Sequence, residues 1–163
     1  MALLNILRYP DPGLSVRCEP VRSFDEQLRT FAFDLLETMR AAPGVGITAA
    51  HVGEHVRLVV LELSREQGPL FYINPEILEI STETMRHVEG SVSMPGATDE
   101  VERPRKIRLR YQDLDGVRHE ENCEGFHAIC MQHEIDQLDG VFWLKRLSRL
   151  KRDRLVRKWE KSR

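Results

Sequence analysis

Residues 125–140 read GFHAICMQHEIDQLDG, and the remaining elements are most easily placed relative to them. Phe126, Cys130, His133 and Gln137 follow one another at intervals of four, three and four residues. This spacing predicts a helix over 125–138 with these four side chains on one face, and the Asp-Gly pair that follows predicts its end. We expect this helix to be central to the fold.

Several segments before the central helix are rich in branched residues and predict strands. Asn74-Pro75 predicts a break between the second and third of these strands, and Asp115-Gly116 predicts a hairpin turn between the last two. We therefore expect antiparallel pairing. The predicted strands are 57–63, 70–73, 76–85, 106–112 and 117–120.

Two further helices are predicted, one near each end of the chain. The sequence SFDE at 23–26 is typical of a capping box, so the first helix should cover about 24–40. The last helix should cover about 147–161 and direct Leu147, Leu150, Leu155 and Trp159 toward the body. The element order predicts an α+β class, with antiparallel sheets around the central helix, an N-terminal helix and a basic C-terminal helix.

Length and composition predict one compact domain over 1–163, because 41% of the 163 residues are hydrophobic. The longest apolar stretches fall far short of the roughly 20 residues that a membrane span needs, so no membrane contact is expected. The start of the chain lacks a signal-peptide pattern, which predicts a cytoplasmic location. Cys18, Cys123 and Cys130 are an odd number without framework spacing and are expected to be free thiols.

The last 19 residues, 145–163, carry 10 Lys/Arg and 2 Asp/Glu, a charge of +8. Subtracting them from the 24 Lys/Arg and 26 Asp/Glu of the chain leaves −10 on residues 1–144. Such a basic helix could make a weak ribosome or RNA contact. A solvated helix docked on an acidic body explains the same charges.

The central helix contains His133-Glu134-Ile135-Asp136-Gln137, which differs at one position from the motif His-Glu-x-x-His. In that motif two imidazoles one turn apart bind a metal ion and the Glu acts as a general base. The second imidazole is replaced here by the amide of Gln137. Taken alone, the pair is weak evidence for a metal site, and a hydrogen-bonded buried His beside a surface Glu is its more common explanation.

Three segments together resemble the signature segments of the peptide deformylase family, in the same order. They read GVGITAAHVG at 44–53, EGSVS at 89–93 and QHEIDQLDG at 132–140. The resemblance implies removal of the formyl group from formyl-methionyl peptides by water bound to a divalent ion, commonly iron, with zinc or nickel as alternatives. The implied substrate is an N-terminal peptide or a small N-acyl compound.

The resemblance also implies roles for individual residues. Glu134 would be the general base, His133 a metal ligand, and the backbone N–H of Val92 a donor to the oxyanion. His51 stands where the family has an oxyanion-binding Gln. For the apolar substrate positions, ordinary core packing is an equally good interpretation. The implied substrate-binding residues are Val45, Gly46, Phe126, Ile129 and Cys130.

Two of the three ligand positions differ from the family pattern, because Ser91 replaces a cysteine and Gln137 a histidine. A hydroxyl and an amide are poor ligands for such ions, so the metal is expected to be weakly bound or absent. The first hypothesis is therefore a deformylase-like protein with weak or lost activity and a retained peptide cleft.

Two other hypotheses remain open. One is a metallohydrolase with altered ligands that cleaves formyl or other N-acyl groups, in which His51, or the thiolate of Cys130, joins His133 at the ion. The other is a metal-free hydrolase in which Ser91 is the nucleophile and His133 its base.

Overall fold

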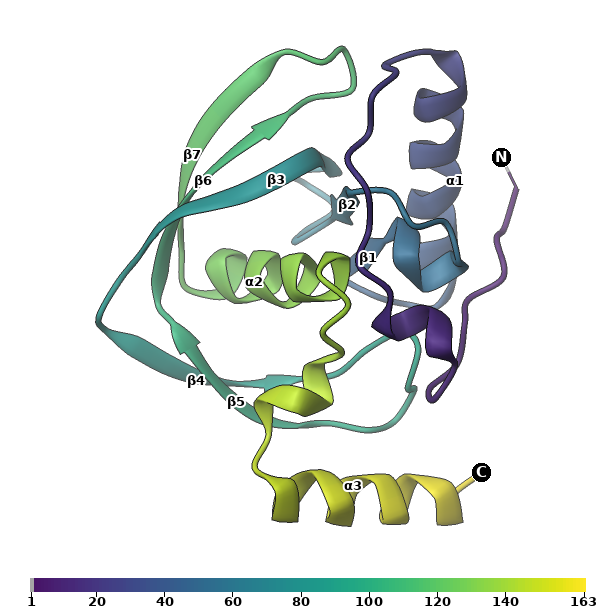
Figure 1. The fold of residues 1–163 in the computed structure, drawn as a ribbon, viewed down its shortest axis with the longest axis vertical. Coiled ribbons are helices and arrows are strands. Elements are labelled where there is room, and N and C mark those ends of the chain that lie inside the picture. Colours follow the sequence, from purple (N-terminus) through teal and green to yellow (C-terminus); the bar gives the residue numbers. More distant parts are fainter. Residues whose placement is uncertain (1) are drawn as a thin grey trace.

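A computed structural model describes residues 2–163 and shows two antiparallel sheets around one helix (Figure 1). The larger sheet has five strands in the order β1-β2-β3-β6-β7, and β4 pairs with β5 in a second sheet. The strands are β1 (Gly46–Thr48), β2 (Leu58–Leu61), β3 (Leu70–Ile80), β4 (Thr84–Glu89), β5 (Asp99–Pro104), β6 (Lys106–Gln112) and β7 (Arg118–Glu124). The longer helices are α1 (Glu26–Ala41), α2 (Phe126–Leu138) and α3 (Arg149–Lys161). The predicted α+β class is confirmed.

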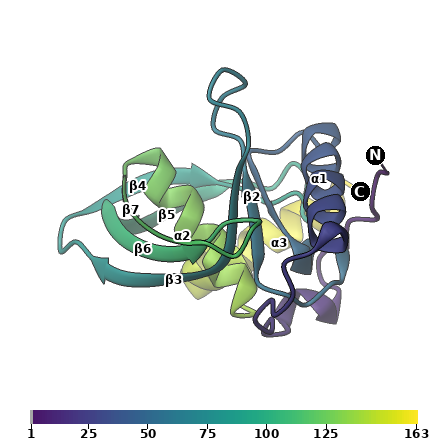
Figure 2. The same cartoon turned by 90° about the horizontal axis from the view of Figure 1, so that it is seen from above.

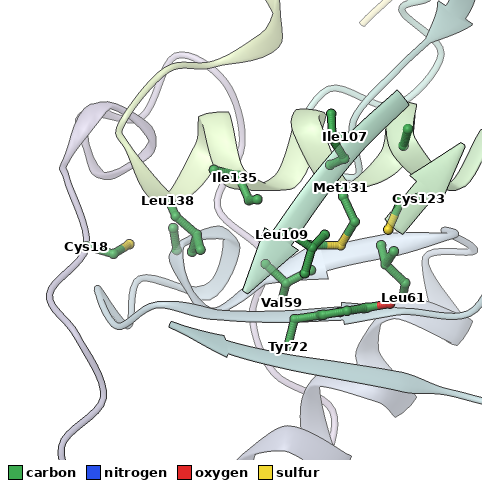
Figure 3. Close-up of a cluster of buried hydrophobic side chains, with 12 residues drawn as sticks. Cys18, Val59, Leu61, Tyr72, Ile107, Leu109, Cys123, Met131, Ile135 and Leu138 are labelled. Carbon is green, nitrogen blue, oxygen red and sulfur yellow. The ribbon is translucent and has the colours of Figure 1, made fainter. Parts of the chain in front are cut away.

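Helix α2 lies between the two sheets, and residues on opposite sides of the helix are therefore buried. Met131, Ile135 and Leu138 pack against the five-stranded sheet, where they meet Val59 and Leu109 (Figure 3). Successive residues of a strand point to opposite faces, so β2 also presents side chains to α1. Figure 2 shows α1 and α2 on opposite sides of β2. The sheet is therefore covered on both faces in this region, which fixes α2 in position.

Helix α1 begins two residues later than predicted. The residue that caps it is Asp25, whose side chain accepts a hydrogen bond from the N–H of Leu28 at 3.0 Å, so the assignment of Ser23 as the cap was wrong. Asp25 has the extended backbone conformation that an N-cap needs. Leu35 and Met39 are fully buried and attach the helix to the sheet.

The prediction of a break at Asn74-Pro75 was also wrong, because β3 continues through this pair. Asn74 has a φ of 53°, and the strand register shifts between Ile73 and Glu76. The Asn74 amide stabilises this irregularity by bonding the backbone N–H and C=O of Val21 at 2.8 and 3.0 Å. The hairpin between β6 and β7 is confirmed, with Gly116 at a φ of 83°. The strand predicted at 76–85 is divided between β3 and β4, and β5 was not predicted.

Helix α3 lies outside the sheets and contacts the body through its C-terminal half (Figure 1). The indole N–H of Trp159 donates a hydrogen bond to the carbonyl oxygen of Pro95 at 2.8 Å. Leu147 and Trp159 are buried as expected, but Leu150 is 68% exposed, so its predicted contact with the body was wrong. In the described part of the chain, no helix combines the length and apolar character that a membrane crossing requires.

Candidate functional site

A cavity of about 390 Å³ lies beside α2 and contains most of the residues that the signature segments indicated. Its walls come from α2, from the segment that enters β1, and from the loop between β4 and β5. We call this cavity the cleft. Among the indicated residues, the cleft is lined by Val45, Gly46, His51, Ser91, Val92, Phe126, Ile129, Cys130, His133 and Glu134.

The orientation of His133 is set by a buried carboxylate. Its Nδ1 lies 2.8 Å from Oε1 of Glu89, and Glu89 also accepts hydrogen bonds from Arg103 at 2.6 and 2.9 Å. Burial would raise the pKa of Glu89, but the bonds from His133 and Arg103 outweigh this effect and lower it to about 2. Glu89 is therefore an anion at neutral pH, so Nδ1 of His133 carries a proton and donates to it. The other ring nitrogen, Nε2, is left free of this bond.

Glu134 is buried, and its Oε1 has no hydrogen-bond partner among the described residues. Burial raises the pKa of Glu134 to about 7. A side chain at Gly46 would collide with the Glu134 carboxylate and with Leu61, which explains the glycine at this position. Glu134 thus has the pKa of a general base or acid that works near neutral pH.

His51 is held in one tautomer by the turn in which it lies. The backbone N–H of Thr48 donates to Nδ1 of His51 at 2.9 Å, so Nδ1 is the acceptor and the proton lies on Nε2. Burial, with His133 nearby, lowers the pKa of His51 to about 3, and the ring is neutral. His51 therefore presents an N–H donor and not a metal-binding lone pair. This geometry disfavours the interpretation in which His51 replaces a lost ligand.

Gln137 does not line the cleft, although it is buried on α2. Its Nε2 donates a hydrogen bond of 2.7 Å to the carbonyl oxygen of Leu14 in the short 3-10 helix η1 (Pro12–Ser15). Ser91 does line the cleft, and its Oγ accepts from the N–H of Ser93 at 3.0 Å. One imidazole, one hydroxyl already bonded to the backbone, and an amide directed elsewhere do not fit the divalent ion of the family.

A different set of side chains has the composition of a metal site. Among residues 2–163, Glu121, Cys123 and His127 are the one group of three or more His, Cys, Asp or Glu side chains whose ligand atoms lie within 4.8 Å of one another. None of them lines the cleft. This group was not predicted from the sequence, where Cys123 was expected only to be a free thiol. The spacing Glu-x-Cys-x-x-x-His could have indicated it.

Comparison with known proteins agrees with the fold. The model of the polypeptide deformylase family matches residues 3–153. A peptide deformylase-like protein of Agrobacterium fabrum is 66% identical over 100% of this chain and 99% of its own length. A peptide deformylase of Rhodopseudomonas palustris is 45% identical over 99% of this chain and 93% of its own length.

Solved structures give the same result. The peptide deformylase of Ehrlichia chaffeensis in complex with actinonin superposes with a TM-score of 0.93 at 38% identity, covering 99% of this chain and 98% of the other. That of Legionella pneumophila has a TM-score of 0.93 at 37% identity, covering 98% and 95%. The fold is thus that of a deformylase. The chain belongs to the peptide deformylase family.

Proposed function

We propose that this chain binds the N-terminal residue of a peptide, or a small N-acyl compound, in the cleft and has weak or no deformylase activity. The observation that carries the proposal is the bond from Gln137 to the Leu14 carbonyl, which uses the side chain at one ligand position for the fold. Together with Ser91 in place of a thiolate, it leaves His133 as the single matching ligand.

Electrostatics supports the loss of the family's metal, whether iron, zinc or nickel. A thiolate and two imidazoles offset the charge of the ion with one negative charge, whereas Ser91 and Gln137 are neutral. Weak binding or absence of the ion follows. The interpretation with Cys130 as a substitute ligand is also disfavoured, because among the described residues Cys130 belongs to no group of three ligand atoms that lie within 4.8 Å of one another.

The remaining groups of the cleft still suit an N-terminal residue with an amide beside it. Ile129 is buried in the wall, whereas Val45 and Phe126 are 38% and 41% exposed and accessible to a side chain of the ligand. His51 supplies a neutral N–H, and the backbone N–H of Val92 is a second donor. Two such donors can hold a carbonyl oxygen of the ligand.

The relatives give independent support for a role apart from ordinary deformylation. Relatives with 53–66% identity are named peptide deformylase-like, whereas three with 43–45% identity are named peptide deformylase. Bradyrhizobium diazoefficiens has one protein of each kind, 56% and 43% identical to this chain. A protein similar to this one therefore exists beside a deformylase in the same organism.

Calorimetric titration with a formyl-methionyl tripeptide, with turnover followed in the same sample, tests the proposal. We expect binding and little or no release of formate. Cys130→Phe should abolish binding by filling the cleft, and Cys130→Ala is the matched control that should retain it. Turnover at the rate of an ordinary deformylase, or no binding by the native chain, would contradict the proposal.

A restoration series then tests the assigned positions. Ser91→Cys with Gln137→His should restore metal binding, and adding His51→Gln should raise activity by about 10–1000-fold, the effect of one oxyanion donor. Replacing Glu134 by Gln in this triple variant should abolish activity while the ion stays bound. A folded triple variant that binds no metal would show that positions 91, 133 and 137 do not surround one point.

A second candidate function is metal-free hydrolysis with Ser91 as the nucleophile. The hydrogen bond between His133 and Glu89 favours this function, since a carboxylate also orients the catalytic imidazole in serine hydrolases. This function is opposed by the lack of a hydrogen bond between Ser91 and His133 among the described residues; the Oγ of Ser91 accepts instead from the Ser93 N–H. A serine-directed phosphonate should label Ser91 if this function exists, and an unlabelled protein would exclude it.

A further inference from the structure

Glu121, Cys123 and His127 meet where the last strand of the large sheet turns into the central helix. Glu121 and Cys123 lie on β7, two residues apart and therefore on the same side of the strand. His127 is on the first turn of α2, and Gly125, with a φ of 62°, reverses the chain between the two elements. The turn thus brings three different ligand types into one place.

The spacing of the atoms suits a tetrahedral ion. The distance from Sγ of Cys123 to Nε2 of His127 is 3.6 Å. A tetrahedral zinc ion with Zn–S of about 2.3 Å and Zn–N of about 2.05 Å separates its sulfur and nitrogen ligands by about 3.6 Å. An ion could therefore sit between these two side chains with little movement of either.

Tyr72 completes the surroundings of the group. Its hydroxyl lies 2.8 Å from Oε1 of Glu121 and 2.9 Å from Nε2 of His127. In Figure 3 the hydroxyl end of Tyr72 and the sulfur of Cys123 lie at the same end of the apolar cluster. Cys123 and Tyr72 are 2% and 1% exposed, whereas Glu121 and His127 are half-buried, so an ion here would be partly shielded from solvent.

The charges also suit a divalent ion of the zinc class. A thiolate and a carboxylate together offset two positive charges, whereas Ser91, His133 and Gln137 at the family's ligand positions supply no such pair. Sulfur and imidazole nitrogen favour zinc or cobalt over magnesium, which prefers oxygen ligands. Binding of the ion releases the thiol proton of Cys123.

We propose that Glu121, Cys123 and His127 bind one zinc-class divalent ion, with the Tyr72 hydroxyl beside the fourth position. The thiol of Cys123 loses its proton to solvent. His127 moves its ring proton to Nδ1, so that Nε2 exchanges its bond to the Tyr72 hydroxyl for the ion. The ion joins β7 to α2 without entering the cleft. This site does not depend on the proposed function, since none of its ligands lines the cleft.

Cobalt is the probe for this site, because cobalt bound to a thiolate absorbs light by charge transfer in the near ultraviolet. The reduced full-length chain, free of metal and oxygen, is titrated with cobalt and then with zinc. We expect one cobalt ion to bind with this absorption and zinc to displace it. Magnesium in excess should displace none. No thiolate absorption in the native chain would overturn the proposal.

Variants locate the ion. Cys123→Ser should abolish the absorption and lower the affinity by at least about 100-fold, which is the upper end of what losing a hydrogen-bond partner of a ligand costs. His127→Gln and Glu121→Gln should also weaken cobalt binding. These two variants replace Cys123→Ser as the test if that variant does not fold. Cys130→Ala is the matched control, because Cys130 is a half-buried cysteine on α2 outside this group, and its loss should leave the signal unchanged. Loss of the signal in Cys130→Ala, or its survival in Cys123→Ser, would overturn the proposal.

Discussion

Replacing Gln137 by Met should show that this side chain stabilises the fold and does not serve the cleft. Methionine has nearly the same volume, so the cavity term is small. The variant loses the 2.7 Å bond to Leu14 and leaves a buried carbonyl without its donor. An orphaned buried acceptor costs about 1–3 kcal/mol, so the free energy of unfolding should fall by about 2 kcal/mol. For a chain of 163 residues this lowers the Tm by about 4–8 °C.

Urea denaturation followed by circular dichroism measures this change, and Gln27→Met is the matched control. Gln27 is an exposed glutamine on α1, where the same substitution should stay within about 0.5 kcal/mol of the native value. If Gln137→Met unfolds at the same urea concentration as the native chain, the bond to Leu14 contributes nothing. The amide would then be free to turn toward the cleft, and the reasoning against a metal there would lose its main support.

Three further predictions concern other parts of the molecule. The pKa of Glu89 is about 2, below its ordinary 4.5, so its contribution to stability is present above pH 4.5 and is lost as the pH falls toward 2. Glu89→Gln should accordingly cost about 3–5 kcal/mol at neutral pH and flatten the acid side of the stability curve; an unchanged curve contradicts this. Gly46→Ala should lower the free energy of unfolding by about 1–3 kcal/mol through collision with the buried carboxylate, and equal urea midpoints would refute it. Exchanging the exposed Lys151 and Lys158 for Glu, which leaves α3 docked, should weaken any salt-dependent cosedimentation with ribosomes; if the native chain does not cosediment at low salt, the basic helix has no such role.

Helices were easier to predict from this sequence than strands, for a physical reason. The spacing of Phe126, Cys130 and His133 is local information, and it placed α2 to within one residue. Strand limits depend on partners elsewhere in the chain. Strand β3 continues through Asn74 because the carbonyl oxygen of Val21, 53 residues away, accepts a hydrogen bond from the Asn74 side-chain amide. The charged sequence of β5 (Asp99–Pro104) carries no apolar alternation, and only its pairing with β4 makes it a strand.

The site shows the same difference between what local sequence patterns predict and what depends on residues distant in the chain. The signature segments were sufficient to predict which residues belong to one cleft, and the structure brings all of them there except Gln137. The direction of the Gln137 amide is set by the Leu14 carbonyl, 123 residues away, and no local pattern contains that information. The group of Cys123 and His127 was missed because its members lie on two different elements. The individual catalytic and binding roles stay predictions.

The buried carboxyl of Glu134 also bears on how selection acts on this protein. A buried polar group without a partner costs about 1–3 kcal/mol, so an apolar residue of similar size should make the fold more stable. Natural proteins lie only slightly above the stability that they need, and a costly group persists where function requires it. Glu134 has such a cost, because its Oε1 is buried without a partner in the described chain. A protein with no use for its cleft would gain stability by a single substitution at this residue.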